Sequence, residues 1–530
     1  MVAVLVIVAI ARLRLLNFPL ERDEGEYAYA GQLMLQGIPP YELAYNMKFP
    51  GTYAAYAVIM ALFGPTPAGI HFGLLCLTTL TALMLFRLGK EMLDEITGVV
   101  AATSYAVLAA SPSMLGLAGH ATHFCAFFVT AGFCLMWRAR QKESYLTLAA
   151  GGALFGTAVL MKQHAAIIAA WAGLSFAFEK MFRSKDSIGK RFASVAAYEF
   201  AMLVPFALCC LWLWHAGVFA KFKFWTIDYA REYASVVPWS YAPQLFWHGF
   251  SWVIKKGFLL WLLAFAGPVL VWLDARWKGS RGWFLGFCIA SALAVCPDFY
   301  FRKHYFLIAL PALALLAGAA VSGLQKIRGG KSKTSPLGDW PAWGYAVFVV
   351  ITIFTVASVW FRLPIPQIIR GTSATDHGLY GADPLPEAEI VARFVAENSP
   401  PDSSLVVLGS EPEIYFLAHR HSATGYIYTY PLMEPQPFAM NMQHEMIGDI
   451  ETHRPRFVIF ADNIMSWNRR PDSNLAIFSW WDNYQTNYTL VGMTDIISPT
   501  NTVCVFGTNY IARYPEARGS ALAVFQRNQP

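Results

Sequence analysis

The stretch Ala193–Trp214, ASVAAYEFAMLVPFALCCLWLW, decides the class of fold. It holds a single charged residue, Glu199, over a length that is enough for a helix to cross a bilayer. A transmembrane helix needs about 20 predominantly apolar residues, because the hydrocarbon core is roughly 30 Å thick. The stretch therefore predicts a membrane-spanning helix.

The rest of the chain has the same apolar character. Of its 530 residues, 56% are hydrophobic and only 14% are charged, and the mean hydropathy is +0.41. Soluble domains carry about 25% charged residues. This deficit predicts that much of the surface faces lipid, and we expect membrane lipids, not nucleic acid, as partners.

Ten further apolar segments are long enough to span, so we predict about eleven transmembrane helices. The first, Met1–Leu16, is short and is interrupted at its end by Arg12 and Arg14, which predicts that the true N-terminus lies upstream of Met1. It also lacks the basic start and cleavage site of a signal peptide. The ten segments are residues 1–16, 67–86, 97–112, 122–137, 146–161, 164–179, 257–273, 283–297, 304–323 and 341–360.

Charge decides which side of the membrane each loop faces, because cytoplasmic loops carry an excess of Lys and Arg. Suppose that the N-terminus is cytoplasmic and that Thr52–Phe63 lies at the outer surface without spanning. Five short inner loops then hold seventeen of the Lys and Arg residues. If Thr52–Phe63 did span, the bias would be inverted. The basic residues of these loops are Arg87, Lys90, Arg138, Arg140, Lys142, Lys180, Arg183, Lys185, Lys190, Arg191, Arg276, Lys278, Arg281, Lys326, Arg328, Lys331 and Lys333.

This topology predicts two domains. Residues 1–360 form the transmembrane domain, including an outer loop over residues 17–66 with juxtamembrane helices, and residues 361–530 form a soluble α/β domain outside. In the tail, helices are expected over Pro386–Glu397 and Glu411–His419, between strands. The expected strands are Ser404–Leu408, Arg456–Phe460, Tyr488–Gly492, Thr502–Phe506 and Leu522–Gln526.

Four acidic residues crowd the first outer loop, in the run Glu21-Arg22-Asp23-Glu24-Gly25-Glu26. One interpretation is structural: Asp23 caps a helix over Glu24–Gln36 and Glu26 completes a capping box. The other is chemical: an outer carboxylate acts as general base on an acceptor hydroxyl. The two are compatible, since a cap holds a carboxylate in place.

Cations and histidines recur at the same predicted face of the membrane. Lys48 lies where the outer loop meets its surface helix, and Lys162 lies at the outer junction of two spans. His120 and His123 share a helix face at the outer end of another span. They could bind a metal, but no third ligand is apparent, so we interpret them as polar lining of an outer cavity.

The run Phe299–Phe306, FYFRKHYF, places Arg302, Lys303 and His304 at the outer mouth of a span. Aromatic residues there form an interfacial belt, but the cations run against the charge bias. Ionisable residues at membrane depth are functional candidates. A carboxylate beside several cations is what transfer from a phosphate-linked sugar needs, because the base activates the acceptor and the cations stabilise the departing phosphate.

These residues resemble landmarks of GT-C glycosyltransferases of the protein O-mannosyltransferase and lipid A aminoarabinose transferase type, glycosyltransferase family 39. The resemblance covers roughly residues 1–325 and is strongest in the first hundred. Asp23-Glu24 matches the family's Asp-Glu pair in the first outer loop, and Lys48-Phe49-Pro50 resembles its Lys-Pro step with one residue added. Met161-Lys162, and His304-Tyr305 followed by Pro311, resemble later landmarks.

The resemblance implies a polyprenyl-phosphate sugar donor and an active site at the outer face. Asp23 would be the catalytic carboxylate, supported by Glu24. The donor phosphate would be bound by Lys48, Lys162, Arg302, His304 and Tyr305. Where many relatives have an acidic residue after the third span, this chain has His120 and His123. That departure implies no certain cofactor and leaves a divalent metal open.

In the tail, Gly409-Ser410-Glu411-Pro412-Glu413 follows a strand and opens a helix. We interpret it as a helix cap made by Ser410 with acids in the first turn, although Glu411 could also touch the acceptor. The tail does not resemble the repeat domain of eukaryotic protein mannosyltransferases, so the acceptor can be a glycan, a lipid or a protein.

The sequence thus favours an inverting hexosyl or pentosyl transferase in a bacterial inner membrane, with its C-terminal domain periplasmic or extracellular. Two other functions compete. A transporter would show inverted repeats and charges at mid-membrane, and the sequence shows neither. A non-catalytic scaffold for envelope polysaccharide or lipid assembly would not explain why scattered cations gather with a carboxylate.

Overall fold

The computed structural model describes residues 1–142, 144–328, 350, 352–353, 377–508 and 520–528. The chain forms two compact units, each built from separate parts of the sequence. The helical unit comprises Met1–Leu15, His71–Leu211 and Val237–Leu363. The mixed unit comprises Leu16–Ile70, Trp212–Val236 and Pro364–Pro530.

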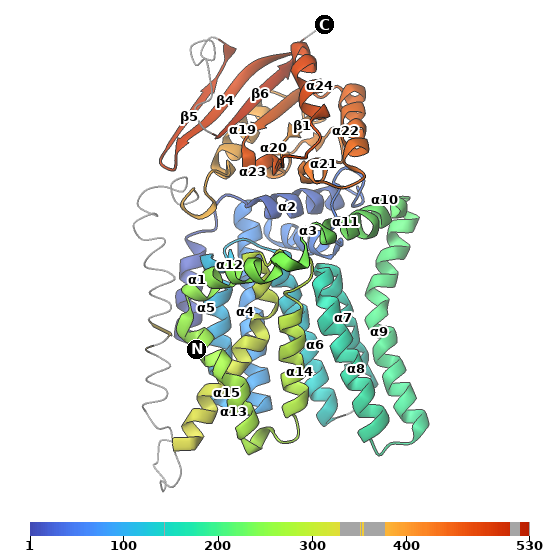
Figure 1. The fold of residues 1–530 in the computed structure, drawn as a ribbon, viewed down its shortest axis with the longest axis vertical. Coiled ribbons are helices and arrows are strands. Elements are labelled where there is room, and N and C mark those ends of the chain that lie inside the picture. Colours follow the sequence, from blue (N-terminus) through green and yellow to red (C-terminus); the bar gives the residue numbers. More distant parts are fainter. Residues whose placement is uncertain (143, 329–349, 351, 354–376, 509–519, 529–530) are drawn as a thin grey trace. The chain divides into compact units, whose positions relative to one another are not determined.

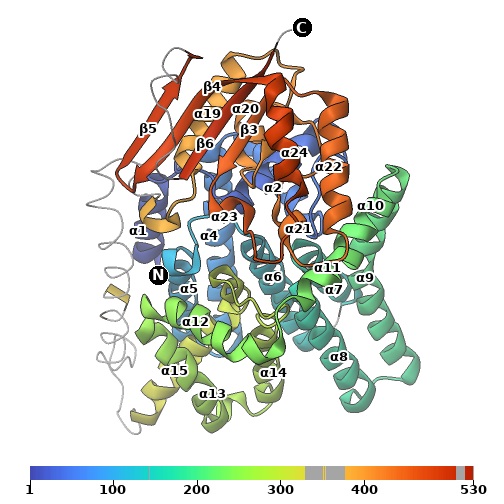
Figure 2. The same cartoon turned by 45° about the horizontal axis from the view of Figure 1, so that its top comes forward.

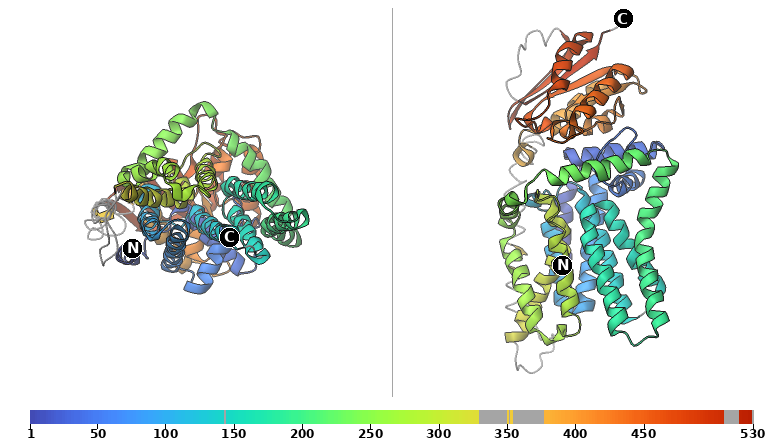
Figure 3. Two further views of the ribbon diagram at one scale, coloured as in Figure 1. Left: turned by 90° about the horizontal axis from the view of Figure 1, so that it is seen from below. Right: turned by 45° about the vertical axis from the view of Figure 1, so that its right-hand side comes forward.

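The helical unit contains the predicted spans. Each predicted span up to residue 323 has a helix at its place, and the one at 341–360 lies largely outside the described residues. The helices are α1 (Val2–Leu13), α4 (Pro67–Met92), α5 (Glu95–Ala109), α6 (Ala121–Gln141), α7 (Tyr145–Met161), α8 (Ala166–Arg183), α9 (Ile188–His215), α12 (Ala242–Lys255), α13 (Phe258–Leu273), α14 (Arg281–Leu293) and α15 (Leu310–Arg328). Most of these helices run side by side (Figure 3), whereas α12 is bent by 114° against α13.

Length and apolarity support membrane crossing most clearly for part of this set. In the described chain, Pro67–Met92, Gln163–Arg183 and Ile188–His215 are each long and apolar enough to cross a membrane. The pair Trp239–Lys255 and Phe258–Leu273, bent by 114°, would add a fourth crossing if it is a single span. Six shorter apolar helices accompany them, so the number of eleven spans stays a prediction.

Small residues let the helices of this unit pack closely. A Cβ at Gly98 of α5 would lie 2.3 Å from the carbonyl oxygen of Phe86 in α4. A Cβ at Gly318 of α15 would lie 2.4 Å from the carbonyl oxygen of Thr97 in α5. Helices in lipid associate through such close backbone contacts, because burying apolar surface gains little there. These glycines therefore place α5 between α4 and α15.

The C-terminal part of the mixed unit is built on a six-stranded mixed sheet in the order β2-β1-β3-β6-β4-β5 (Figure 1). β1 pairs in parallel with β2 and β3, and the remaining pairs are antiparallel. The strands are β1 (Ser404–Leu408), β2 (His421–Ser422), β3 (Phe457–Asp462), β4 (Tyr488–Ser498), β5 (Asn501–Phe506) and β6 (Ser520–Arg527). All five predicted strands are present, and β2 is additional.

Helices cover both faces of this sheet (Figure 2). Alternate residues of a strand point to opposite faces, and β3 shows this directly. Phe457 contacts Phe394 of α19 (Leu385–Glu397), with ring centroids 6.2 Å apart, whereas Phe460 stacks on Trp481 of α24 (Ala476–Tyr484) at 6.1 Å. The other tail helices are α20 (Glu413–Ala418), α21 (Tyr430–Met433), α22 (Ala439–His453) and α23 (Ile464–Trp467).

The first outer loop belongs to the mixed unit and contributes α2 (Arg22–Leu35) and α3 (Gly51–Phe63). Gly37, with φ +83°, ends α2 as predicted, and the Ile38 N–H donates to the Leu33 carbonyl at 2.9 Å. This bond satisfies an orphan carbonyl of the last turn. The predicted domain boundary at residue 361 stays a prediction, but the compact units group the loop with the C-terminal sheet.

Helix α2 packs directly on the C-terminal part of the unit. The closest approach is at Gly25, where a Cβ would lie 2.6 Å from the backbone nitrogen of Glu413 in α20. Farther along, the Ser422 N–H donates to the phenol of Tyr29 at 2.7 Å. In the loop that follows, the Tyr45 N–H donates to the Gly425 carbonyl at 2.7 Å.

The segment Trp212–Val236 completes the mixed unit with α10 (Phe219–Lys223), the π-helix η3 (Phe224–Tyr229) and α11 (Ala230–Ser235). Its buried aromatic residues pack on the loop and on the tail. Trp225 lies 5.5 Å from the ring of Tyr45 and 5.9 Å from that of Tyr426. The phenol of Tyr229 donates to Glu434. Three separate parts of the chain thus share one core.

We predict that Gly25→Ala destabilises the protein, because the new methyl group meets backbone atoms that cannot turn aside. Overpacking of this kind costs about 1–3 kcal/mol. Gly448→Ala in α22 is the matched control, since nothing lies within 4 Å of its Cβ position. Thermal unfolding of the purified full chain should show a lower Tm for Gly25→Ala only. Equal Tm values for the two variants would contradict the observed packing of α2 on α20.

Candidate functional site

The N-terminal end of α2 is capped by Glu21 and not, as predicted, by Asp23. The Asp23 N–H donates to the Glu21 carboxylate at 2.8 Å, and the Glu21 N–H donates to Glu24 at 3.3 Å. This is a reciprocal capping box, of the kind that satisfies orphan donors at a helix start. The prediction was wrong by two residues because several acids compete for the cap. The cap therefore does not occupy the carboxylate of Asp23.

Asp23 instead shares a cation with Glu26. The Lys48 ammonium donates to Asp23 Oδ1 at 3.0 Å and to Glu26 Oε2 at 2.6 Å. The phenol of Tyr53 in α3 donates to the other oxygen of Glu26 at 2.6 Å. Burial lowers the pKa of Lys48, but the carboxylates of Asp23 and Glu26 outweigh it and raise the pKa well above its usual value. Lys48 is therefore a permanent ammonium.

Exposure separates the four acids of this run. The side chain of Asp23 is 22% exposed, whereas Glu24 and Glu26 are 1% and 0% exposed as residues. Glu21 and Glu24 serve the cap, and Glu26 serves Lys48 and Tyr53. Asp23 is therefore the partly accessible carboxylate beside a fixed cation. A second donor reaches it from the C-terminal tail, where the phenol of Tyr428 donates to Asp23 Oδ1 at 3.2 Å.

Glu411, predicted as an acceptor contact, is fully buried. Its carboxylate lies 3.5 Å from Arg22 Nη2 and accepts a hydrogen bond from Ser466 Oγ at 2.8 Å. Arg22 also pairs with Asp383 at 3.0 Å. A buried carboxylate needs such partners, since an unpaired buried charge is costly. In the structure Glu411 ties α2 to the tail, and its contact with an acceptor stays a prediction.

The predicted helix cap at Ser410 is wrong. Helix α20 begins at Glu413 with Pro412 at the cap position and has no side-chain cap. The Ser410 hydroxyl accepts instead from the Thr429 N–H at 3.0 Å. The serine thus joins two segments of the tail.

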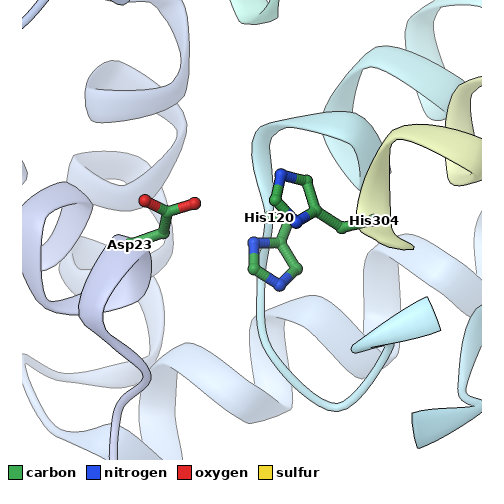
Figure 4. A group of neighbouring side chains, drawn as sticks. All are labelled: Asp23, His120 and His304. Atoms are coloured by element: carbon green, nitrogen blue, oxygen red, sulfur yellow. The ribbon is translucent and has the colours of Figure 1, made fainter. Parts of the chain in front are cut away.

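Several predicted donor-site residues lie together in the helical unit. Lys162 Nζ lies 4.0 Å from the ring centroid of Tyr305, and the rings of Tyr305 and His304 are 4.9 Å apart. His304 in turn stacks on His120 with ring centroids 4.1 Å apart and planes inclined by 11° (Figure 4). These residues come from the start of α6, the junction of α7 and α8, and the 3₁₀ helix η6 (Lys303–Ile308).

The remaining residues of this cluster add to its polarity. His123 is buried in the first turn of α6, and its Nε2 lies 3.2 Å from the Ala109 carbonyl. Arg302 is exposed and lies over the ring of Tyr300 at 5.3 Å. Asp298, which the sequence analysis did not single out, lies 3.6 Å from His164 and accepts from the Tyr305 phenol at 3.2 Å.

Imidazole nitrogens are common metal ligands, so the stacked pair bears on the open question of a divalent metal. A ligand nitrogen of His120 and one of His304 lie within 4.8 Å of each other, and the two ring planes are nearly parallel. A metal therefore stays a prediction for this chain.

A family model described as dolichyl-phosphate-mannose-protein mannosyltransferase matches residues 48–220. This part of the chain, about a third of its length, is thus similar to a family of glycosyltransferases. The name of this family refers to a polyprenyl-phosphate sugar, dolichyl-phosphate-mannose, as its donor. A search of the curated proteins finds no match.

Solved structures of glycosyltransferases share the fold. The crystal structure of ArnT from Cupriavidus metallidurans bound to undecaprenyl phosphate has 14% sequence identity and a TM-score of 0.56, covering 98% of this chain and 97% of that one. The oligosaccharyltransferase AglB from Archaeoglobus fulgidus, in complex with an inhibitory peptide and a dolichol-phosphate, has 13% identity and a TM-score of 0.51, covering 96% and 74%. The same archaeal enzyme in complex with Zn and sulfate has 14% identity, a TM-score of 0.52 and coverage of 95% and 73%.

Sequence reasoning missed two residues of the acidic cluster. Glu26 was assigned to the capping box, and only its contact with Lys48 shows its use. Tyr428 lies 405 residues from Asp23 and carries no motif. Its one signal is the run of alternating tyrosines from Tyr426 to Tyr430, which is unusual for a solvent-exposed loop.

Glu413 gives a test of the packing beneath α2. It is 1% exposed, and burial, together with the neighbouring carboxylate of Glu411, raises its pKa well above 4.5. The folded chain therefore holds this proton while the unfolded chain releases it. Stability is lost as the pH rises above about 4.5, because the unfolded state binds fewer protons there.

We predict that Glu413→Gln raises Tm at pH 8, by about 2–4 °C for each kcal/mol gained, and that the gain shrinks toward pH 5. The amide keeps the shape of the side chain but does not titrate, so the variant no longer loses free energy of unfolding as the pH rises. Glu397→Gln, at the exposed end of α19, is the control and should change Tm little. A gain for Glu413→Gln that is the same at both pH values would contradict the assignment.

Proposed function

We propose that the protein transfers a sugar from a polyprenyl-phosphate carrier to an acceptor hydroxyl, with inversion and with Asp23 as the general base. One observation carries this proposal: Asp23 combines partial exposure of its carboxylate with a direct contact to the ammonium of Lys48. Glu24 and Glu26 are buried, and Glu21, which is also partly exposed, serves the cap of α2. The family match begins at Lys48, so the role of Asp23 rests on this geometry and on the Asp-Glu resemblance.

The chain holds both kinds of charged group that such a transfer needs. The acidic cluster at the start of α2 supplies a carboxylate that can accept a proton. The cluster in the helical unit holds Lys162, Arg302, His304 and Tyr305, and its cations suit a departing phosphate. The charge bias of the loops predicts the same outer membrane face for both clusters. Lys48 stays a predicted phosphate contact, although two carboxylates hold its ammonium in the structure.

The proposed step is a single displacement. The acceptor hydroxyl gives its proton to the Asp23 carboxylate as its oxygen forms a bond to the anomeric carbon of the sugar. The bond from that carbon to the phosphate oxygen breaks, and its electron pair leaves with the polyprenyl phosphate. The configuration at the anomeric carbon inverts, because the acceptor attacks from the side opposite the departing phosphate. Cations near the phosphate stabilise the negative charge that develops on it.

Two of the solved relatives support a lipid-phosphate ligand. ArnT was crystallised with undecaprenyl phosphate, and the archaeal oligosaccharyltransferase with a dolichol-phosphate and a peptide. We infer a polyprenyl phosphate as the leaving group here and leave the acceptor class as glycan, lipid or protein. A bacterial inner membrane, with a cytoplasmic N-terminus, is the proposed location.

A panel of radiolabelled polyprenyl-phosphate sugars tests this function. The purified full chain in lipid nanodiscs should release or transfer the sugar of at least one hexosyl or pentosyl donor. We predict that Asp23→Asn lowers that turnover on the order of a hundredfold to ten-thousandfold, the usual contribution of a general base. Asp482→Asn, at an exposed position of α24, should leave turnover unchanged.

Two outcomes would count against the proposal. Full turnover by Asp23→Asn would remove Asp23 as the base. No turnover of any donor by folded protein would favour the scaffold, and uptake of a donor without its cleavage would favour a transporter.

A further inference from the structure

The run Tyr426–Tyr430 of the C-terminal tail is held rigidly against the start of α2. The Thr429 N–H donates to Ser410 Oγ at 3.0 Å, and the Thr429 hydroxyl donates to the Ser466 carbonyl at 3.1 Å. The phenol of Tyr430 contacts Arg22 of α2 and donates to the Met465 carbonyl at 2.8 Å. These bonds fix the backbone on one side of Tyr428, so its side chain has a defined position.

That position places the Tyr428 phenol on the carboxylate of Asp23. The hydroxyl lies 3.2 Å from Asp23 Oδ1, the same oxygen that accepts from Lys48 at 3.0 Å. The ring also lies 5.8 Å from Lys48 Nζ and is 6% exposed. Burial, and then the nearby carboxylates of Asp23 and Glu26, raise the pKa of Tyr428 well above its usual value. The phenol therefore keeps its proton and acts as a donor.

We propose that Tyr428 is a positioning residue for the transfer, acting through Asp23, and that the soluble tail thereby contributes directly to the reaction. This inference rests on the proposed function. Two donors on one carboxylate oxygen restrict rotation about the side-chain bonds of Asp23. A base must be held within hydrogen-bond reach of the proton that it takes, and small losses of orientation cost large factors in rate.

A purely structural role is the competing explanation, in which Tyr428 only helps α2 to dock on the tail. Docking has other contacts that do not involve this hydroxyl. They include the backbone contact of Gly25 with Glu413, the Arg22–Glu411 pair and the Tyr29 contact with Ser422. Loss of one hydroxyl should therefore leave α2 docked and change the reaction.

Tyr428→Phe tests the inference, because it removes the donor and keeps the ring over Lys48. We expect kcat to fall roughly tenfold to a hundredfold with an unchanged KM for the donor and an unchanged Tm. The acidic limb of the pH profile should move to higher pH, since a carboxylate that loses a hydrogen-bond donor has a higher pKa. Lys48, Glu26 and Tyr27 also face this carboxylate and are the same in both proteins.

Tyr488→Phe is the matched control. Its phenol donates to the Pro455 carbonyl at 3.1 Å, within the tail of the same unit. It should keep the wild-type kcat and pH profile. If Tyr428→Phe does not fold, 3,5-difluorotyrosine at position 428 is the second test. As a stronger donor, it should move the acidic limb to lower pH.

The outcomes separate this inference from the function on which it rests. If Asp23→Asn abolishes transfer while Tyr428→Phe keeps the wild-type kcat and pH profile, the inference is wrong and the function stands. If kcat falls only in proportion to a fall in folded protein, the role is structural and the inference is again wrong. If Asp23→Asn keeps full transfer, the proposed base is wrong and the inference fails with it.

Discussion

The ammonium of Lys48, held between Asp23 and Glu26, is the interaction on which the mixed unit and its chemistry depend. Two carboxylates one helical turn apart repel each other when buried, and a shared cation offsets that repulsion. The same pair ties the loop before α3 to the first turn of α2. Helix α2 is tied in turn to the tail by the buried contact at Gly25 and by Arg22. The position of Asp23 is therefore set by parts of the chain hundreds of residues apart.

This arrangement changes the role of the C-terminal region. Sequence patterns describe it as a separate soluble domain, whereas the first loop, the segment after α9 and the tail share one core. The positions of the acidic side chains consequently depend on that shared core. The cationic and imidazole cluster is a property of the helical unit, where the stack of His304 on His120 and the contact of Lys162 with Tyr305 hold its segments together.

Hydropathy alone predicted the helices of the membrane region, because a span needs length and apolarity and little else. Alternation and turn residues predicted the strands of the tail. The cap of α2 was misplaced by two residues, since Glu21, Asp23 and Glu24 are all competent caps and only geometry selects among them. The sequence could not predict that Glu411 pairs with Arg22 or that Tyr428 donates to Asp23. Such contacts join residues far apart in the chain and leave no local sequence pattern. Lys162, His304 and Tyr305 could be grouped by topology, but the stacking of His304 on His120 could not.

The stereochemistry of the product tests the central claim most directly. The account holds that Asp23 is a base in a single displacement and not a nucleophile. NMR of the sugar transferred from a donor of known anomeric configuration distinguishes the two, because the anomeric proton coupling reports the configuration of the product. The account predicts an inverted anomeric centre from the first turnover onward. A retained configuration would mean that a covalent sugar–enzyme intermediate forms, and it would contradict the role assigned to Asp23.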